Sequence, residues 1–128
     1  MAKLPDKAME LFNDVQAMKV IATVDAAGKP HLTPKGTMMA IDDETIAYSE
    51  MAGGKTKSNL EATKQAAMLA CKELKAWKVR GVLHGVHTSG DVLEQFKKTA
   101  KEKFGLDINN VVLIKIEEVY TSSGKQVA

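Results

Sequence analysis

The chain has a single cysteine, Cys71, and no run of apolar residues near the length of a membrane span. An internal disulfide is therefore excluded, and a reducing, cytoplasmic setting is expected. A membrane-spanning helix needs about 20 consecutive apolar residues. The first twelve residues, MAKLPDKAMELF, carry acidic side chains where a signal peptide has a continuous apolar core, so export is not expected.

The chain also has a small net charge and few aromatic side chains. Eighteen Lys and Arg oppose 16 Asp and Glu, and the formal net charge of +2 does not by itself indicate nucleic-acid binding. Four lysines between residues 97 and 103 would suit a nucleic-acid backbone. Tyr48 and Tyr120 are not interleaved with basic residues, as a surface that stacks bases requires. A non-enzymatic binding module is therefore the weaker alternative.

The patterns of metal centres and nucleophilic catalysis are missing. His84 and His87 lie on a predicted strand at an odd separation, which places their side chains on opposite faces. His31 is remote in sequence, and no H-E-x-x-H or cysteine pair accompanies it. Cys71 lies in an alanine-rich segment and is expected to be a small buried apolar residue. We predict no metal site, and nothing indicates a Ser-His-Asp arrangement.

The first half of the chain predicts one helix followed by strands. Its length of 128 residues fits a single domain, residues 1–128, with one core. Behind Pro5, apolar residues recur at helical spacing as far as Met18, which predicts a helix over one end of the fold. Gly28 permits the positive φ of a hairpin turn. The predicted strands are residues 20–24, 30–35, 37–41 and 45–49.

The second half predicts two helices and three strands. A short helix over 56–63 is followed by a strand over 66–72, although the Ala, Lys and Leu content of residues 61–74 favours a helix as the alternative. Residues 77–88 predict a long strand, in which Gly81 and Gly85 mark bends or bulges.

A helix and a last strand complete this half. Asp91 and Glu94 form a capping-box pattern that starts a helix ending near Gly105. The alternation within 111–119 predicts a half-buried strand.

One turn carries the strongest indication of a ligand. Gly53 and Gly54 precede Lys55, Thr56 and Lys57 at the start of the predicted short helix. Unpaired backbone N–H groups at a helix start, with two ammonium groups and a hydroxyl, suit a phosphate. The spacing is not that of a P-loop. The sequence therefore predicts a site for a phosphorylated cofactor.

The fold expected from these elements is mainly β. Short strands joined by hairpins favour a small antiparallel barrel, because crossover helices do not alternate with the strands. The patterns D-x-x-G-x-P-H-x-T-P, K-T-x-x-N-L, V-R-G and T-S-G, in this order, resemble the FMN-binding split-barrel family of the pyridoxamine 5′-phosphate oxidases and small flavin-binding proteins. The resemblance implies a Greek-key split barrel of about six to seven strands with two to three flanking helices.

The resemblance also implies a set of cofactor-binding residues. In the small flavin-binding members a Lys-Thr pair before x-x-Asn holds the FMN phosphate, and Lys55-Thr56 precedes Asn59 here. Many members place the lysine three residues before that Asn, where this chain has Thr56, so whether Lys55 or Lys57 makes the main contact stays open. The implied cofactor-binding residues are Thr33, Pro34, Lys35, Gly36, Thr37, Ser49, Glu50, Met51, Lys55, Thr56, Lys57, Asn59 and Trp77.

Within this set, further roles follow from the resemblance. Residues 33–37 would run along the flavin ring and ribityl chain, and Lys35 would be a cation near the N1 and O2 edge. The implied function is an FMN-binding oxidoreductase or electron-transfer protein with a small acceptor. A full pyridoxamine-phosphate oxidase is not expected, because the chain ends at KQVA without the Arg and His of those enzymes. A split barrel that binds haem or a deazaflavin remains an alternative.

A homodimer that shares the flavin is expected. The interior of a small barrel is filled by its own side chains, so a flavin ring must lie outside, where a second subunit would exclude water. In the family, Trp77 would then reach the partner's cofactor. The apolar residues in apparent excess of one core are Met38, Met39, Val79, Val82, Leu83 and Val86. Met38 and Met39 are themselves expected to be core residues.

Overall fold

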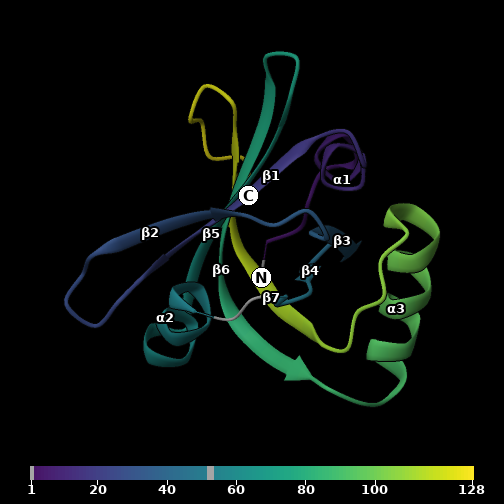
Figure 1. Cartoon of the computed structure of the whole chain (residues 1–128). Coiled ribbons are helices and arrows are strands. Elements are labelled where there is room, and N and C mark those ends of the chain that lie inside the picture. Colours follow the sequence, from purple (N-terminus) through teal and green to yellow (C-terminus); the bar gives the residue numbers. More distant parts are fainter. Residues whose placement is uncertain (1, 52–53) are drawn as a thin grey trace.

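The computed structural model describes residues 2–51 and 54–128. Figure 1 shows a coiled sheet with helices around it. The helices are α1 (Asp6–Phe12), α2 (Lys55–Thr63) and α3 (Asp91–Phe104). The strands are β1 (Met18–Val24), β2 (Pro30–Pro34), β3 (Met39–Asp42), β4 (Thr45–Tyr48), β5 (Gln65–Lys72), β6 (Lys75–His87) and β7 (Val111–Thr121).

All seven strands belong to one antiparallel sheet, in the order β2-β1-β5-β6-β7-β4-β3. The strands β2 and β3 form its two edges, although they are neighbours in sequence. The long strands β6 and β7 connect the two halves, so the sheet coils into a split barrel. The expected mainly-β split barrel of about six to seven strands with two to three flanking helices is confirmed, since the described residues form seven strands and three helices. None of the described helices is long and apolar enough to cross a membrane.

Strand β6 bends where the sequence predicts. Its pairing with β7 shifts register between Arg80 and Gly81 and again between Leu83 and Gly85. At Gly81 a Cβ atom would stand 2.3 Å from the carbonyl oxygen of Lys115, so only glycine fits against β7 there.

The segment 65–72 forms a strand rather than the alternative helix. Strand β5 pairs with β1 on one side and β6 on the other, so every position has a partner in the ladder. Ala66, Met68 and Ala70 are buried, whereas Ala67 and Leu69 are partly exposed. The burial alternates as it does in a strand. Pairing with β1 and β6 outweighs the helix propensity of the alanines, so the segment forms a strand.

Two groups of buried side chains make up the core. The larger lies inside the barrel, where Phe12 of α1 and Leu60 of α2 meet Met38, Tyr48 and the inner residues of the strands. The smaller lies between α3 and the far face of the sheet, around Phe96 and Met39. Met38 and Met39 are therefore core residues, as predicted.

The prediction for the first helix was wrong at its end. Helix α1 stops at Phe12, and Val15 and Met18 are 52% and 62% exposed. The Asp14 carboxylate accepts a hydrogen bond from the N–H of Gln16, a local turn that competes with helix continuation. Met18 instead begins β1.

The capping box was also wrong. Gly90, with φ of +95°, is the N-cap of α3, and Asp91 is the first helical residue without a capping side-chain bond. Leu93 and Phe96 lie on the buried face of this helix, whereas Val92 is 38% exposed.

The last strand is more buried than a half-buried pattern predicts. Residues Val111–Ile114 of β7 are buried on both faces, because α3 covers the outer one. Cys71 is partly exposed rather than buried.

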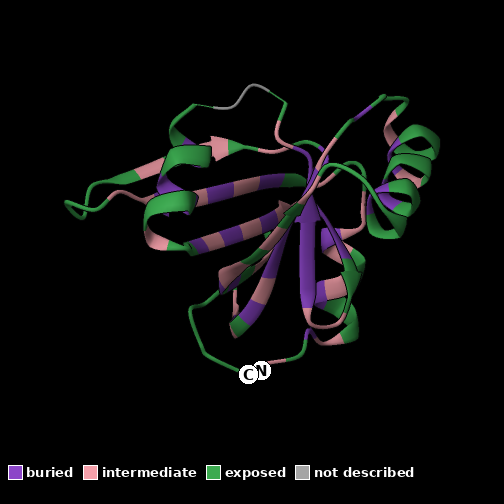
Figure 2. Ribbon diagram, turned by 90° about the horizontal axis from the view of Figure 1, so that it is seen from below, coloured by how far each residue is buried: buried purple, intermediate pink, exposed green. Residues whose placement is uncertain are grey.

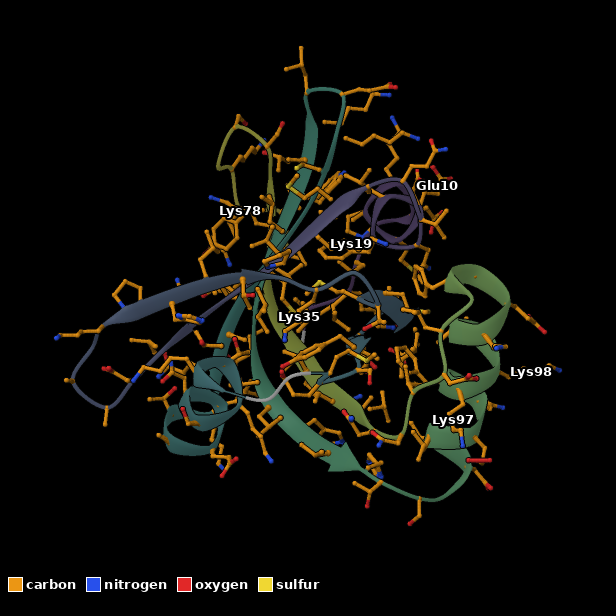
Figure 3. All side chains as sticks on the ribbon, in the orientation of Figure 1. Glu10, Lys19, Lys35, Lys78, Lys97 and Lys98 are labelled. Atoms are coloured by element: carbon orange, nitrogen blue, oxygen red, sulfur yellow. The ribbon has the colours of Figure 1, made fainter. Side chains whose placement is uncertain are left out.

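Lys19 is an unusual member of the inner face of β1. It is 4% exposed, and its Nζ lies 5.8 Å from the ring centroid of Phe104. Burial lowers the pKa of Lys19 to about 8, although the Asp14 carboxylate partly opposes this effect. Figure 3 shows Lys19 within the body of the protein, whereas Lys98 extends outward from α3.

Candidate functional site

The start of α2 has the character that the sequence predicts for a phosphate site. Gly54, with φ of +85°, is the N-cap, and no acidic residue occupies the first turn of this described helix. Lys55 and Lys57 are exposed, and Thr56 is buried. The positive φ at Gly54 suits a residue without a Cβ. The other glycine of the predicted turn, Gly53, lies outside the described residues.

Helix α2 is fixed to β1 by side-chain hydrogen bonds. The Nδ2 of Asn59 donates to Oγ1 of Thr23 at 3.1 Å, and the hydroxyl of Thr63 donates to the carbonyl oxygen of Val24 at 3.0 Å. Asn59 and Thr23 are both buried. Asn59 therefore positions the helix that carries the two lysines.

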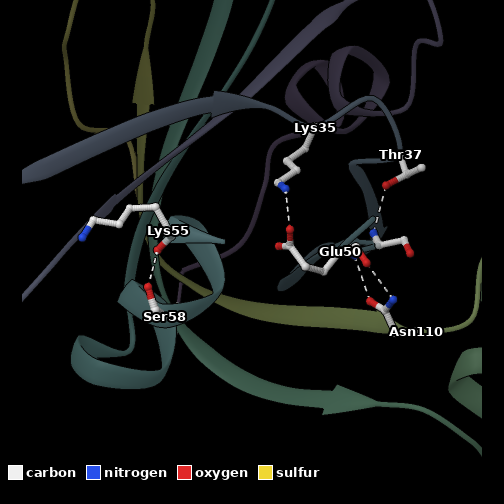
Figure 4. A network of polar contacts seen from close by, with 7 residues as sticks. Lys35, Thr37, Glu50, Lys55, Ser58 and Asn110 are labelled. Carbon is white, nitrogen blue, oxygen red and sulfur yellow. Dashed lines mark hydrogen bonds and ion pairs between the residues drawn. The ribbon is translucent and has the colours of Figure 1, made fainter. Parts of the chain in front are cut away.

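A polar network follows the end of β4 (Figure 4). The N–H of Ser49 donates to Oγ1 of Thr37 at 2.9 Å. Glu50 is held twice by Asn110, because its N–H donates to Oδ1 at 2.8 Å and its carbonyl accepts from Nδ2 at 2.9 Å. Lys35 Nζ lies 2.9 Å from Glu50 Oε1. The network fixes both the backbone and the side chain of Glu50.

The ion pair between Lys35 and Glu50 is largely removed from water. The Lys35 side chain is 12% exposed and that of Glu50 is 9% exposed. Lys35 Nζ also lies 5.4 Å from the ring centroid of Tyr48. Buried ion pairs of this kind are costly to break, because the remaining charge has no compensation. The cation predicted near a flavin edge is thus already paired within the protein.

A pocket of about 640 Å³ joins α2 to this network. Its walls come from α2, the end of β4, the bent end of β6 and the start of β7. The lining residues are Tyr48, Glu50, Lys57, Leu60, Glu61, Leu83, Val86, Thr88, Asn109, Asn110 and Val112. The volume lies within the range of about 300 to 1,000 Å³ that is common for small-molecule sites.

Three buried polar atoms at and beside this pocket have no hydrogen-bond partner within the described protein. They are Tyr48 Oη, Ser49 Oγ and Glu50 Oε2. Burial and the neighbouring Glu50 carboxylate raise the pKa of the Tyr48 hydroxyl, so it stays protonated at neutral pH. Buried polar groups are normally satisfied, which makes these atoms candidates for ligand contacts.

The structure brings together only part of the predicted set. Thr37, Ser49, Glu50 and Lys35 share the polar network, and Lys57 joins Glu50 in the pocket lining. The backbone of Lys35 is anchored too, since its N–H donates to the Lys19 carbonyl at 3.0 Å.

The other predicted residues lie outside this pocket lining. Thr33 and Pro34 are on the edge strand β2, Gly36 follows it, and Met51 is 60% exposed. Lys55 is on α2 beside the pocket without lining it.

Trp77 lies away from this site. It lines a separate cavity of about 510 Å³ with Glu10 and Leu11 of α1. Within one subunit it therefore does not meet the residues of the α2 pocket. Its proposed contact with a partner's cofactor stays a prediction.

Asn110 and Tyr48 are among the pocket residues that sequence reasoning missed. Asn110 is 60 positions from Glu50, and no motif links them. Tyr48 directly precedes Ser49 in a buried strand, where its aromatic ring resembles an ordinary core residue. Its unpaired hydroxyl becomes visible only in the structure. Among the described residues, no group of three His, Cys, Asp or Glu is placed to hold a metal ion.

Comparison with known families agrees with this architecture. The model of the pyridoxamine 5′-phosphate oxidase family matches residues 4–123. The chain belongs to this family. No curated protein matches the chain.

Solved structures share the family fold over almost the whole chain. HupZ of Group A Streptococcus is 26% identical, with a TM-score of 0.83, and the match covers 98% of this chain and 99% of HupZ. A candidate pyridoxamine 5′-phosphate oxidase from Lactobacillus delbrueckii is 29% identical, with a TM-score of 0.74 and coverage of 92% and 93%. An FMN-binding protein from Syntrophomonas wolfei is 20% identical, with a TM-score of 0.80 and coverage of 91% and 84%.

The same fold occurs in proteins with other ligands. An F420 reductase is 15% identical, with a TM-score of 0.72 and coverage of 91% and 98%. HutZ, the heme storage protein of Vibrio cholerae, is 19% identical, with a TM-score of 0.66 and coverage of 93% and 94%. At these identities the likeness concerns the fold alone.

Proposed function

We propose that this protein is an FMN-binding flavoprotein, an oxidoreductase or electron-transfer protein with a small acceptor. It would act as one domain, residues 1–128, in a reducing, cytoplasmic setting. The observation that carries the proposal is the pocket of about 640 Å³, which has a lysine-bearing helix start at one end and buried, unpaired polar atoms in its wall. The phosphate of flavin mononucleotide would bind at the helix start, and the polar edges of its ring would face the polar atoms of the wall.

The start of α2 fits the phosphate. Lys55 and Lys57 supply two cations, and Gly54 leaves the first N–H groups of the helix open to an anion. Lys57 also lines the pocket, so a cofactor whose phosphate is held there would extend its remaining part into the cavity. Because Asn59 is bonded to Thr23, we assign it to positioning the helix.

The pocket walls fit the ring. Leu60, Leu83 and Val112 present apolar surface, while Tyr48 and Glu50 present polar atoms. When bound, the flavin supplies the electron chemistry, and the protein supplies position and electrostatics. The ion pair with Glu50 favours a positioning role for Lys35.

The first test is a visible spectrum of the purified protein, with and without added FMN. We expect flavin absorption bands, or quenching of FMN fluorescence on titration, because the pocket removes the ring from water. A colourless protein that leaves the fluorescence of added FMN unchanged would contradict the proposal. A Soret band on addition of haem in place of flavin binding would favour a haem protein. Tight binding of a deazaflavin in preference to FMN would favour the other alternative.

We further propose that two copies form a homodimer around an apolar sheet face. Alternate residues of a strand face opposite sides, and in β1 the inner, buried face carries Lys19, Ile21 and Thr23. The outer face carries Val20 and Ala22, which pair with Leu69 and Ala67 of β5. Figure 2 shows buried and partly exposed residues alternating along these strands.

The outer face continues onto the neighbouring edge strand. Leu32 of β2 pairs with Ala22 and is 69% exposed. A contiguous apolar face of this kind is typical of a protein interface. The residues Met38, Met39 and Val79, which the sequence offered as excess apolar surface, are buried inside the subunit and cannot form it. We propose that the second copy also covers the flavin, beside Val86, which lines the pocket and is 56% exposed.

Val20→Glu is expected to convert a dimer to monomers, because it places a charge in the proposed interface between Pro34 and Leu69, neither of which can pair with it. Val92→Glu, at an exposed position of α3, is the matched control and should leave the dimer intact. Sedimentation of both variants and the parent protein, with and without FMN, measures the effect. A parent protein that is monomeric while it binds flavin at nanomolar concentration would exclude the shared site.

A further inference from the structure

Lys19 is the only buried lysine among the described residues, and the proposed cofactor site does not use it. It is paired with Ala70 of β5, and its Nζ stands 5.8 Å from the ring centroid of Phe104 at the end of α3. Ala70 is fully buried and Phe104 is half-buried. The Lys19 side chain is therefore enclosed between the sheet and the end of α3.

The Lys19 amine has no paired anion. The hydrogen bonds and ion pairs that the described lysine side chains form do not include Lys19 Nζ. The carboxylate that acts on it belongs to Asp14, which is already bonded to Lys72 Nζ at 2.8 Å. Lys103, which precedes Phe104, adds a second positive charge from α3. An ammonium group that is buried without a paired anion favours its neutral form.

These surroundings set the protonation of the amine. Burial lowers the pKa of Lys19 to about 8, the Asp14 carboxylate opposes this effect, and the charge of Lys103 adds to it. About a tenth of the Lys19 amine is then neutral at pH 7, against roughly 1 in 2,500 for an ordinary lysine with a pKa of about 10.4. Only the neutral amine is a nucleophile, so Lys19 is suited to attack a carbonyl carbon at neutral pH.

The amine is enclosed but not sealed from water. Lys19 Nζ lacks a hydrogen-bond partner, yet it does not belong to the described partnerless atoms that have no accessible surface. A reagent can therefore contact the nitrogen. Because the residue is only 4% exposed, the opening favours a small reagent over a bulky one.

We propose that Lys19 is a modification site whose amine is acylated by a small activated carboxylic acid, of which an acyl phosphate is the simplest kind. The amine nitrogen attacks the carbonyl carbon, so that an N–C bond forms while the C–O bond to phosphate breaks. Phosphate leaves, and the amine proton passes to water. This inference goes beyond the proposed flavin function and does not depend on it.

The product of acylation suits the enclosed site. An acylated lysine is an uncharged amide, so the protein no longer has to hold an ammonium group away from water. A modification that left a negative charge would bury this charge beside the face of the Phe104 ring, which is itself electronegative. The surroundings therefore favour an acyl group over a group that carries a carboxylate.

Competitive labelling of the intact protein tests the reactivity of Lys19. A trace of acetic anhydride labels the folded chain between pH 6 and pH 11, deuterated anhydride completes the labelling after denaturation, and mass spectrometry gives the ratio at each lysine. At pH 7 we expect Lys19 to take up at least about tenfold more label than Lys98, which is exposed on α3 (Figure 3). The labelling of Lys19 should be half-maximal at about pH 8. Uptake at pH 7 that does not exceed that of Lys98 would overturn the inference.

Acetyl phosphate at pH 7 tests the class of donor. We expect Lys19 to be acetylated before the exposed lysines, because it holds the larger share of neutral amine. The same mass-spectrometric comparison with Lys98 measures the difference. Equal acetylation of the two residues by this donor would contradict the proposed modification, whatever the result with the anhydride.

Phe104→Ala tests whether enclosure makes the amine reactive. Loss of the ring admits water to Lys19 Nζ, so the half-maximal pH should rise by about one unit and the excess of label over Lys98 at pH 7 should fall severalfold. Val92→Ala, at the opposite end of α3, is the matched control and should leave both values unchanged. An unchanged pH profile in Phe104→Ala would refute the proposed cause of the reactivity and the inference with it.

The urea midpoint of each variant establishes whether it is folded. Should Phe104→Ala fail to fold, the comparison of Lys19 with Lys98 in the parent protein still decides the inference.

Discussion

Replacing Lys55 and Lys57 together by alanine is expected to weaken FMN by at least tenfold, and by a hundredfold if both lysines contact the phosphate. Each hydrogen bond to a charged group contributes roughly 1.5 to 3 kcal/mol, and about 1.4 kcal/mol corresponds to a factor of ten in affinity. Both side chains are exposed, so their removal should not disturb the core. Thr56 is buried and is therefore left in place.

Riboflavin, which has the same ring but no phosphate, supplies the internal comparison. Its affinity should change little in the double variant. Lys97→Ala with Lys98→Ala is the matched control, because it removes the same charge from the exposed face of α3. Equal losses for FMN and riboflavin would place the phosphate elsewhere. If FMN is weakened and riboflavin is not, the two single variants show which lysine contributes more to phosphate binding.

Gly81→Ala is expected to destabilise the protein by about 3 kcal/mol or to prevent folding, because overpacking against fixed backbone is among the costliest substitutions. A Cβ at this position would stand 2.3 Å from the Lys115 carbonyl oxygen and 2.8 Å from Cγ2 of Ile114. The strands β6 and β7 would have to separate at the bulge to relieve the contact. Urea unfolding monitored by circular dichroism measures the loss.

Gly85→Ala is the matched control on the same strand. Its Cβ would lie 3.4 Å from Nε2 of His87, an ordinary contact with a side chain that can move. Its stability should remain within about 0.5 kcal/mol of the parent protein. Similar midpoints for the two variants would show that β7 yields at Gly81. The bend there would then not be fixed by close packing.

Local sequence patterns predicted the sheet well where pairing and pattern agree. The alternation in 66–72, the glycines of β6 and the glycine-led start of α2 each have a cause within a few residues. Where a local turn or a neighbouring element intervened, the same patterns were misleading. Helix α1 ends at Phe12 because Asp14 forms a turn, and β7 is buried on both faces because α3 lies over it.

The sequence by itself determined the family, the mainly-β architecture and the placement of two lysines at a helix start, because these depend on periodicity, turn residues and short motifs. Only the tertiary structure decided the wall of the pocket. Glu50 is held by Lys35 from 15 positions away and by Asn110 from 60, and no local pattern encodes such pairs. Likewise, the sequence indicates only that Tyr48 is an aromatic core residue. That it also lines the cavity is visible only in the structure. The physical reason is that burial, and with it the need for a partner, is a property of the folded chain as a whole.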